Sequence, residues 1–197
     1  MLNQIRDILL AEAKVISSLP IDKSAVKAVE AMLSCKGKVF VTGIGKAGYV
    51  ARKTASTFST TGTPSVYLHP GDASHGDVGV ITKNDILLAF SNSGKTREIL
   101  ETVHFSRYLG VEAVITVTSS KDSPLGQESD IVIELGHIEE PCPLGLTPTA
   151  STTAMIAIAD ALALTAMKHR GFTKSDFAAR HHGGYLGKKL REENEDT

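Results

Sequence analysis

Glycines and small polar side chains gather at the ends of two apolar runs, where they could hold an anion. The run from Lys38 to Thr42 leads into Gly43-Ile44-Gly45-Lys46-Ala47-Gly48, and the run from Ile86 to Ser91 leads into Asn92-Ser93-Gly94-Lys95-Thr96. A helix that starts after such a turn offers free backbone N–H groups and a positive dipole end, and both favour a phosphate. The expected phosphate ligands are Gly45, Ser91, Asn92, Ser93 and Thr96.

Two nucleotide motifs resemble these turns. Residues 43–48 match the dinucleotide fingerprint G-x-G-x-x-G, but the next apolar run ends in His69 instead of the acidic residue that would bind a ribose, and Asp72 lies a few residues beyond. The cofactor interpretation is weakened without being excluded. A P-loop would need glycine where Ala89 stands, so a nucleotide triphosphatase is not favoured. The serines could also simply cap a helix, although the density of hydroxyls favours a phosphate site.

Five short apolar runs separated by helical stretches must position these turns. They are rich in Val, Ile and Leu at successive positions, as strands covered on both faces are. The sequence predicts an α/β three-layer sandwich with a five-stranded parallel sheet. The expected strands are 38–42, 65–69, 86–91, 113–118 and 131–135.

Helices are expected on either side of this core. Residues 2–19 and 22–35 have amphipathic patterns, and Asp22 is a plausible N-cap of the second. Residues 151–168 are long and apolar enough for a membrane span, but threonines and Asp160 interrupt them, which favours a helix buried in the core or at a subunit interface. A last helix is expected over 173–189, broken by Gly183-Gly184.

Composition limits the function. The chain has 197 residues, a formal charge of −1 and two cysteines. It carries no basic footprint for nucleic acid or an anionic membrane, no evident secretory signal, and too few cysteines for a disulfide framework or a thiolate zinc site. We expect a cytoplasmic protein with one domain over 1–197, made of N-terminal helices (1–36) and an α/β core (38–190). Both cysteines are expected to be structural.

Five segments in order carry a family resemblance. The turns 43–48 and 91–96, together with 69–77, 140–149 and 181–187, resemble the sugar isomerase (SIS) domain of D-arabinose 5-phosphate isomerases. The resemblance implies a flavodoxin-like sheet and interconversion of D-ribulose 5-phosphate and D-arabinose 5-phosphate in Kdo and lipopolysaccharide biosynthesis, without a cofactor. It also implies a homotetramer or dimer with shared active sites and CMP-Kdo as a possible end-product ligand. Full-length relatives often continue into CBS domains, whereas this chain stops at Thr197.

The resemblance assigns four catalytic residues: Lys46, Glu98, Glu140 and His181. It also leads us to expect His75, Ser151 and Thr152 among the substrate contacts. Two positions depart from the family pattern, because His182 stands where proline is usual and Lys95 where glutamate is common.

Moving a proton between adjacent sugar carbons requires a base and groups that stabilise an enediol. A partly buried carboxylate with a pKa raised toward neutrality suits the base, and Glu140 is the first choice. Glu98 lies in the first turn of a helix, where the dipole makes a carboxylate a poorer base, so a supporting role is expected and exchange of the two roles stays open. Lys46 would offset negative charge, and His181 would move a proton to and from the ring oxygen.

Three alternatives stay open. His69 and His75 with Asp72 or Asp77 could ligate a metal, although a substrate wall is favoured and no metal is expected. The chain could isomerise another sugar phosphate. It could also be a non-catalytic phosphosugar-binding module, such as the sensing half of a regulator.

Overall fold

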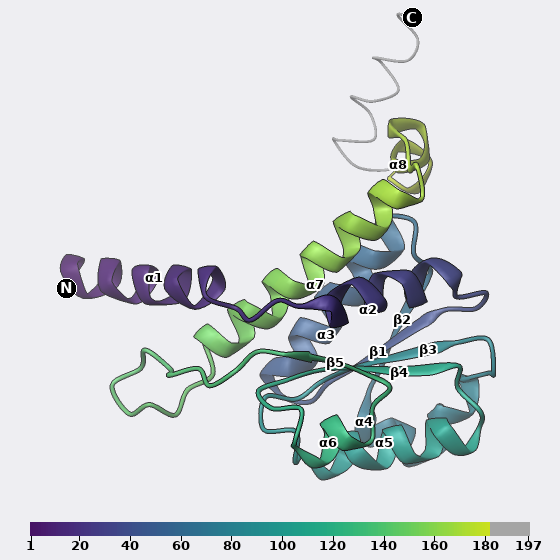
Figure 1. Cartoon of the computed structure of the whole chain (residues 1–197), viewed down its shortest axis with the longest axis horizontal. Coiled ribbons are helices and arrows are strands. Elements are labelled where there is room, and N and C mark those ends of the chain that lie inside the picture. The colour runs from purple at the N-terminus through teal and green to yellow at the C-terminus, as the bar shows by residue number, and fades with distance from the viewer. Residues whose placement is uncertain (182–197) are drawn as a thin grey trace, which may run out of the picture.

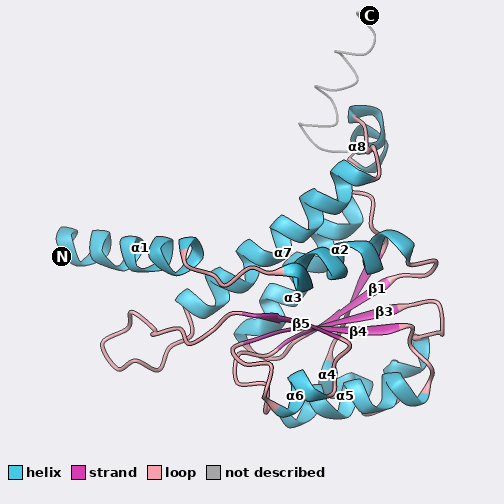
Figure 2. Ribbon diagram, in the orientation of Figure 1, coloured by secondary structure: helices cyan, strands magenta, loops and turns pink. Residues whose placement is uncertain are grey.

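The computed structural model describes residues 1–181 and is built around a five-stranded parallel sheet in the order β2-β1-β3-β4-β5 (Figures 1 and 2). Every neighbouring pair of strands is parallel, with Val39 opposite both Ser65 and Ile86. The predicted α/β sandwich and its strands are confirmed, with ends that differ by one residue at most. The strands are β1 (Val39–Thr42), β2 (Ser65–Leu68), β3 (Ile86–Phe90), β4 (Ala113–Thr118) and β5 (Ile131–Glu134).

Helices cover both faces of the sheet, which is why the strands are apolar at successive positions. All five residues of β3 are buried: Leu88 packs into the core on one face and Leu87 into the core on the other. The first face carries α2 (Lys23–Ser34), α3 (Lys46–Thr60) and α7 (Ala150–His169). The second carries α4 (Pro70–Ala73), η1 (Asp77–Val80), α5 (Arg97–Tyr108) and α6 (Pro124–Gln127).

The strand order places a crevice over β1 and β3. The helix that follows β1 covers one face and the helix that follows β3 covers the other (Figure 1). Ligands of open parallel sheets bind at such a switch point, outside the carboxyl ends of the strands. The two turns singled out in the sequence are the ones that meet there.

Helix α7 is the central helix of its layer. It is long and apolar enough to cross a membrane by composition alone, but it is buried at intervals from Ala150 to Ala166 against α1, α2 and α3. The prediction of a buried core helix is therefore confirmed. Its length of 20 residues corresponds to about 30 Å, so its two ends lie far apart.

Helix α1 (Leu2–Ser17) extends away from the sheet and contacts only α7 extensively (Figure 1). The predicted helix is present, yet none of its residues is buried. Leu2, Leu9 and Leu10 are each more than 60% exposed, so part of the apolar surface of α1 is left uncovered within the described chain. The predicted N-cap of the next helix is confirmed, because the Asp22 carboxylate accepts a hydrogen bond from the Ser24 N–H at 2.8 Å.

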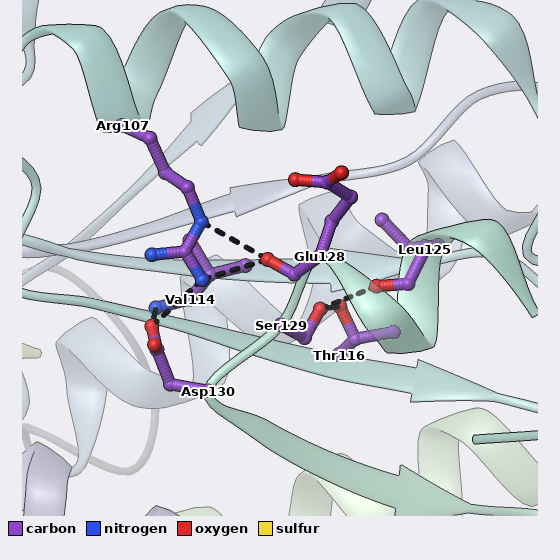
Figure 3. Close-up of polar contacts among 7 residues, drawn as sticks. All are labelled: Arg107, Val114, Thr116, Leu125, Glu128, Ser129 and Asp130. Carbon is purple, nitrogen blue, oxygen red and sulfur yellow. Dashed lines mark hydrogen bonds and ion pairs between the residues drawn. The ribbon is translucent and has the colours of Figure 1, made fainter. Parts of the chain in front are cut away.

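Polar contacts fasten α5 to the β4–β5 side of the sheet (Figure 3). The Arg107 guanidinium donates to the Glu128 carbonyl at 2.7 and 3.0 Å and lies 3.1 Å from the Asp130 carboxylate. Asp130 in turn accepts the Val114 N–H at 2.7 Å. These bonds fix the helix whose first turn lies at the crevice.

The last described helix is α8 (Lys174–Arg180). It begins with a capping box in which the Thr173 and Asp176 side chains each accept the other residue's N–H. The helix predicted over 173–189 is present to Arg180. His182 and the Gly183-Gly184 break lie outside the described residues.

Candidate active site

Three glycines shape the turn from β1 to α3. Gly45 is the N-cap of α3 and has a φ of +60°, a backbone angle that residues with a side chain rarely adopt. A Cβ on Gly43 would lie 2.5 Å from the Ala47 carbonyl oxygen, and one on Gly48 would lie 2.9 Å from the Gly43 carbonyl oxygen. Helix and strand therefore approach as closely as in a dinucleotide-binding turn. Lys46 is the first residue of the helix that follows, and it is exposed.

The loop from β3 to α5 is held by its own hydroxyls and by the neighbouring loop. Ser91 and Thr96 hydroxyl oxygens lie 3.0 Å apart, and Ser91 Oγ accepts the Gly94 N–H at 3.2 Å. Gly94 has a φ of +60°, and a Cβ there would lie 2.2 Å from Ser123 Oγ. The Leu125 N–H donates to the Gly94 carbonyl at 3.0 Å. Residues 91–96 thus form a preformed cradle, which the neighbouring loop at residues 123–125 supports.

The two turns and the start of α7 enclose a cavity of about 310 Å³. Helices α3 and α5 both begin at it without a side-chain cap among the described residues, so the N–H groups of their first turns are free to meet a ligand there. The predicted residues in its lining are Lys46, Ser91, Asn92, Ser93, Thr96, Ser151 and Thr152. The sequence did not single out the apolar remainder: Ile44, Ala47, Phe90, Pro148 and Met155.

Glu140 lies at the start of α7. Its carboxylate accepts the backbone N–H groups of Thr149, Ala150 and Ser151 at 2.8, 2.9 and 3.3 Å, and the Thr149 hydroxyl at 3.3 Å. Partial burial by itself raises its pKa, but hydrogen bonds from Ser151, Thr149 and Ala150 together lower it below the ordinary glutamate value. The expected shift toward neutrality is therefore wrong in direction. The hydrogen bonds win because they favour the anion.

The other predicted residues do not line this cavity. Glu98 is exposed in the first turn of α5 and is not in the lining. Gly45 lines a neighbouring cavity instead. His75 is exposed between α4 and η1 and lines neither cavity.

His181 lies beyond the opposite end of α7. It ends α8, stacks on Phe177 with ring centroids 3.8 Å apart, and has Nδ1 2.9 Å from the Phe177 carbonyl oxygen. The cavity lies at the first turn of α7, about 30 Å away along the helix. One chain therefore does not bring His181 to the other predicted catalytic residues.

The metal alternative finds little geometric basis. His69 Nδ1 lies 3.5 Å from the Asp72 carboxylate, but no group of three His, Cys, Asp or Glu side chains gathers anywhere in residues 1–181. Asp72 is also the carboxylate nearest in sequence to the end of β2, where a dinucleotide-binding protein would have its ribose-binding residue. It lies within α4 with its side chain 68% exposed.

The backbone of its own loop surrounds the Cys142 thiol, a cysteine that the sequence predicts to be structural. Its sulfur accepts the N–H groups of Leu146 and Thr147, each at 3.2 Å. Hydrogen bonds from Thr147 and Leu146 lower its pKa from 9.0 to about 7. The thiol lies on the loop that carries Glu140, and no spacing in the sequence could have shown this backbone nest.

Known proteins match most of the chain. The SIS domain family matches residues 32–165. The arabinose 5-phosphate isomerase KdsD of Pseudomonas aeruginosa is 46% identical over 172 residues, which are 87% of this chain and 52% of that protein. The chain thus spans about half the length of the curated relatives it matches.

Two solved structures are similar over nearly their full length. A candidate phosphosugar isomerase involved in capsule formation from Bacteroides fragilis is 45% identical with a TM-score of 0.91, covering 94% of this chain and 99% of that one. A protein of Escherichia coli CFT073, solved in complex with arabinose 5-phosphate, is 35% identical with a TM-score of 0.87, covering 91% and 96%.

Proposed function

The chain belongs to the SIS domain family, and from this premise we propose that it interconverts D-ribulose 5-phosphate and D-arabinose 5-phosphate as a step of Kdo and lipopolysaccharide biosynthesis. The curated relatives named for this activity support the proposal, as does the related structure with arabinose 5-phosphate bound. A cytoplasmic location is proposed with it.

The observation that carries the proposal is the cavity at the switch point. It combines a lysine, two helix starts without a side-chain cap, and five hydroxyl side chains, those of Ser91, Ser93, Thr96, Ser151 and Thr152. A phosphate of the substrate would accept N–H and O–H donors from residues 91–96. The Lys46 ammonium, on the other wall, would then lie near the negative charge of the phosphate or of the enediolate.

The reaction moves one proton between the two carbons and one between their oxygens, and it changes no oxidation state overall. A base removes a proton from C1 of ribulose 5-phosphate, and the C2 carbonyl oxygen gains a proton, which gives the enediol. A proton then returns to C2 while the C1 hydroxyl loses its proton, which leaves the C1 aldehyde. The base is one of the two carboxylates, Glu98 or Glu140. For Glu140 to act it must first leave the N–H groups that hold it.

We propose that the site is completed by a second subunit in a homotetramer or dimer. His181 is too far from the cavity of its own chain, so a neighbouring chain would supply it. The exposed apolar side of α1 and an apolar groove of about 410 Å³ between α2 and α7 are surfaces that subunits of this chain could bury. CMP-Kdo is proposed as an end-product ligand.

The test is proton NMR of the purified protein with D-ribulose 5-phosphate in deuterated water, without added metal. We expect arabinose 5-phosphate to form with deuterium at C2, and Lys46→Ala and His181→Ala each to lower turnover by about 10²-fold or more. Mixing the two impaired variants should restore part of the activity if subunits share sites. Binding of the sugar phosphate without turnover would instead support a sensing module. CMP-Kdo added to the same assay should inhibit.

A further inference from the structure

Tyr67 links β2 to the turn that carries Lys46. Its hydroxyl donates to the Gly43 carbonyl at 3.1 Å, from a strand position directly opposite Val41 of β1. Partial burial raises the pKa of Tyr67, and the nearby Arg52 charge lowers it by less. The hydroxyl is therefore protonated at neutral pH and available as a donor.

Arg52 holds the other side of the same ring. Its guanidinium carbon lies 4.1 Å from the centroid of the Tyr67 ring, a favourable cation–π distance. Arg52 belongs to α3, less than two turns after Lys46. None of the ion pairs found in residues 1–181 includes Arg52.

The contact between Tyr67 and Gly43 lies where the end of β1 and the start of α3 leave no room for a side chain. A Cβ on Gly48 would be 3.3 Å from the Tyr67 hydroxyl and 2.9 Å from the Gly43 carbonyl oxygen. The hydroxyl therefore lies at a close approach between the end of β1 and the first turn of α3. A shift of either element would move Lys46, which stands between Gly43 and Gly48.

These side chains do not reach the phosphate cavity itself. Arg52 and Tyr67 line a separate cavity of about 390 Å³ on the β2 side of the turn, with Gly45, Gly48, Tyr49 and His69. The phosphate cavity includes neither Arg52 nor Tyr67. Any influence of the pair on substrate therefore passes through the turn.

We propose that Tyr67 and Arg52 are positioning residues that fix the β1–α3 turn so that Lys46 faces the phosphate cavity. This inference rests on the proposed function for the role of Lys46. Tyr67→Phe removes only the hydroxyl and keeps the ring beneath Arg52. We expect kcat/KM to fall by about 2–10-fold, the effect of one lost hydrogen bond, and Arg52→Gln to act in the same direction.

The decisive comparison is made in a Lys46→Ala background, using calorimetric binding of arabinose 5-phosphate. A positioning role predicts that Tyr67→Phe weakens binding in the wild type and has almost no further effect once Lys46 is absent. Tyr108→Phe, at an 86% exposed tyrosine at the end of α5, is the matched control and should change nothing. Equal effects in both backgrounds, or none in either, would overturn the inference.

Failure of the proposed function can be distinguished from failure of the positioning role. A wild type without turnover would refute the isomerase and leave the binding comparison, repeated with inorganic phosphate, to decide the role of Tyr67. If the wild type binds neither ligand, Lys46 has no phosphate to meet and the positioning role fails as well.

Discussion

Replacing Glu140 should destabilise the protein through the start of α7. The N-cap residue of that helix, Thr149, makes no capping bond with its own side chain, and the Glu140 carboxylate takes that role for three successive N–H groups. A capping oxygen contributes about 0.5–2 kcal/mol, and an anion at a helix start a further 0.3–1 kcal/mol or so. Because Glu140 is partly exposed, we expect Glu140→Ala to cost about 1–2 kcal/mol.

Thermal unfolding followed by circular dichroism measures this loss. A cost of that size lowers Tm by roughly 2–8 °C in a chain of this length. Glu140→Gln keeps an acceptor oxygen and should lose less. Glu139→Ala removes the neighbouring exposed carboxylate and is the control. Protein concentration must be equal throughout, because association shifts Tm. A Tm for Glu140→Ala equal to that of Glu139→Ala would refute the capping role.

The comparison of wild type with Glu140→Gln also predicts how stability depends on pH. The folded pKa of Glu140 lies below its ordinary value of 4.5, so the stabilisation is complete above that value and is lost as pH falls through the folded pKa. The Tm advantage of wild type over Glu140→Gln should stay constant from neutral pH to about pH 5 and shrink below it. An advantage that grows on acidification would contradict the reasoning.

Three further outcomes are expected. Lys46→Ala should lower kcat/KM by about 10²–10³-fold in the isomerase assay, as loss of a charge-stabilising group does, while Tm stays near that of wild type. Gly94→Ala should weaken phosphate binding and lower Tm by more than Gly145→Ala, because both have positive φ but only Gly94 lacks space for a Cβ; equal effects would show that crowding is unimportant. Cys142 should be alkylated half-maximally near pH 7 and faster than Cys35, whose pKa burial raises, as read by mass spectrometry; a faster Cys35 would refute the thiolate nest.

The sheet could be predicted from the sequence because its physical signal is local. Runs such as 86–91 are apolar at nearly every position, and a strand covered on both faces requires that. The cradle at 91–96 could be predicted for the same reason, since hydroxyl residues follow directly on the strand. The short helices α4, η1 and α6 could not, because one turn carries no periodicity.

The environment of Glu140 and Cys142 could not be predicted because it depends on the path of one loop. Glu140 reaches N–H groups nine to eleven residues ahead, and Cys142 reaches two that are four and five residues ahead. No periodicity encodes either contact. The resemblance indicated that Glu140 matters, but only the loop geometry gives the direction of its pKa shift.

The length of α7 keeps His181 away from the cavity of its own chain, so activity that needs a second subunit would depend on protein concentration. If His181 of one subunit completes the cavity of another, a separated subunit keeps its phosphate cradle and loses its chemistry. Specific activity should then fall on dilution while phosphate affinity per chain stays constant. A cell could thereby tune flux through the step by expression level, with output rising more steeply than the number of chains.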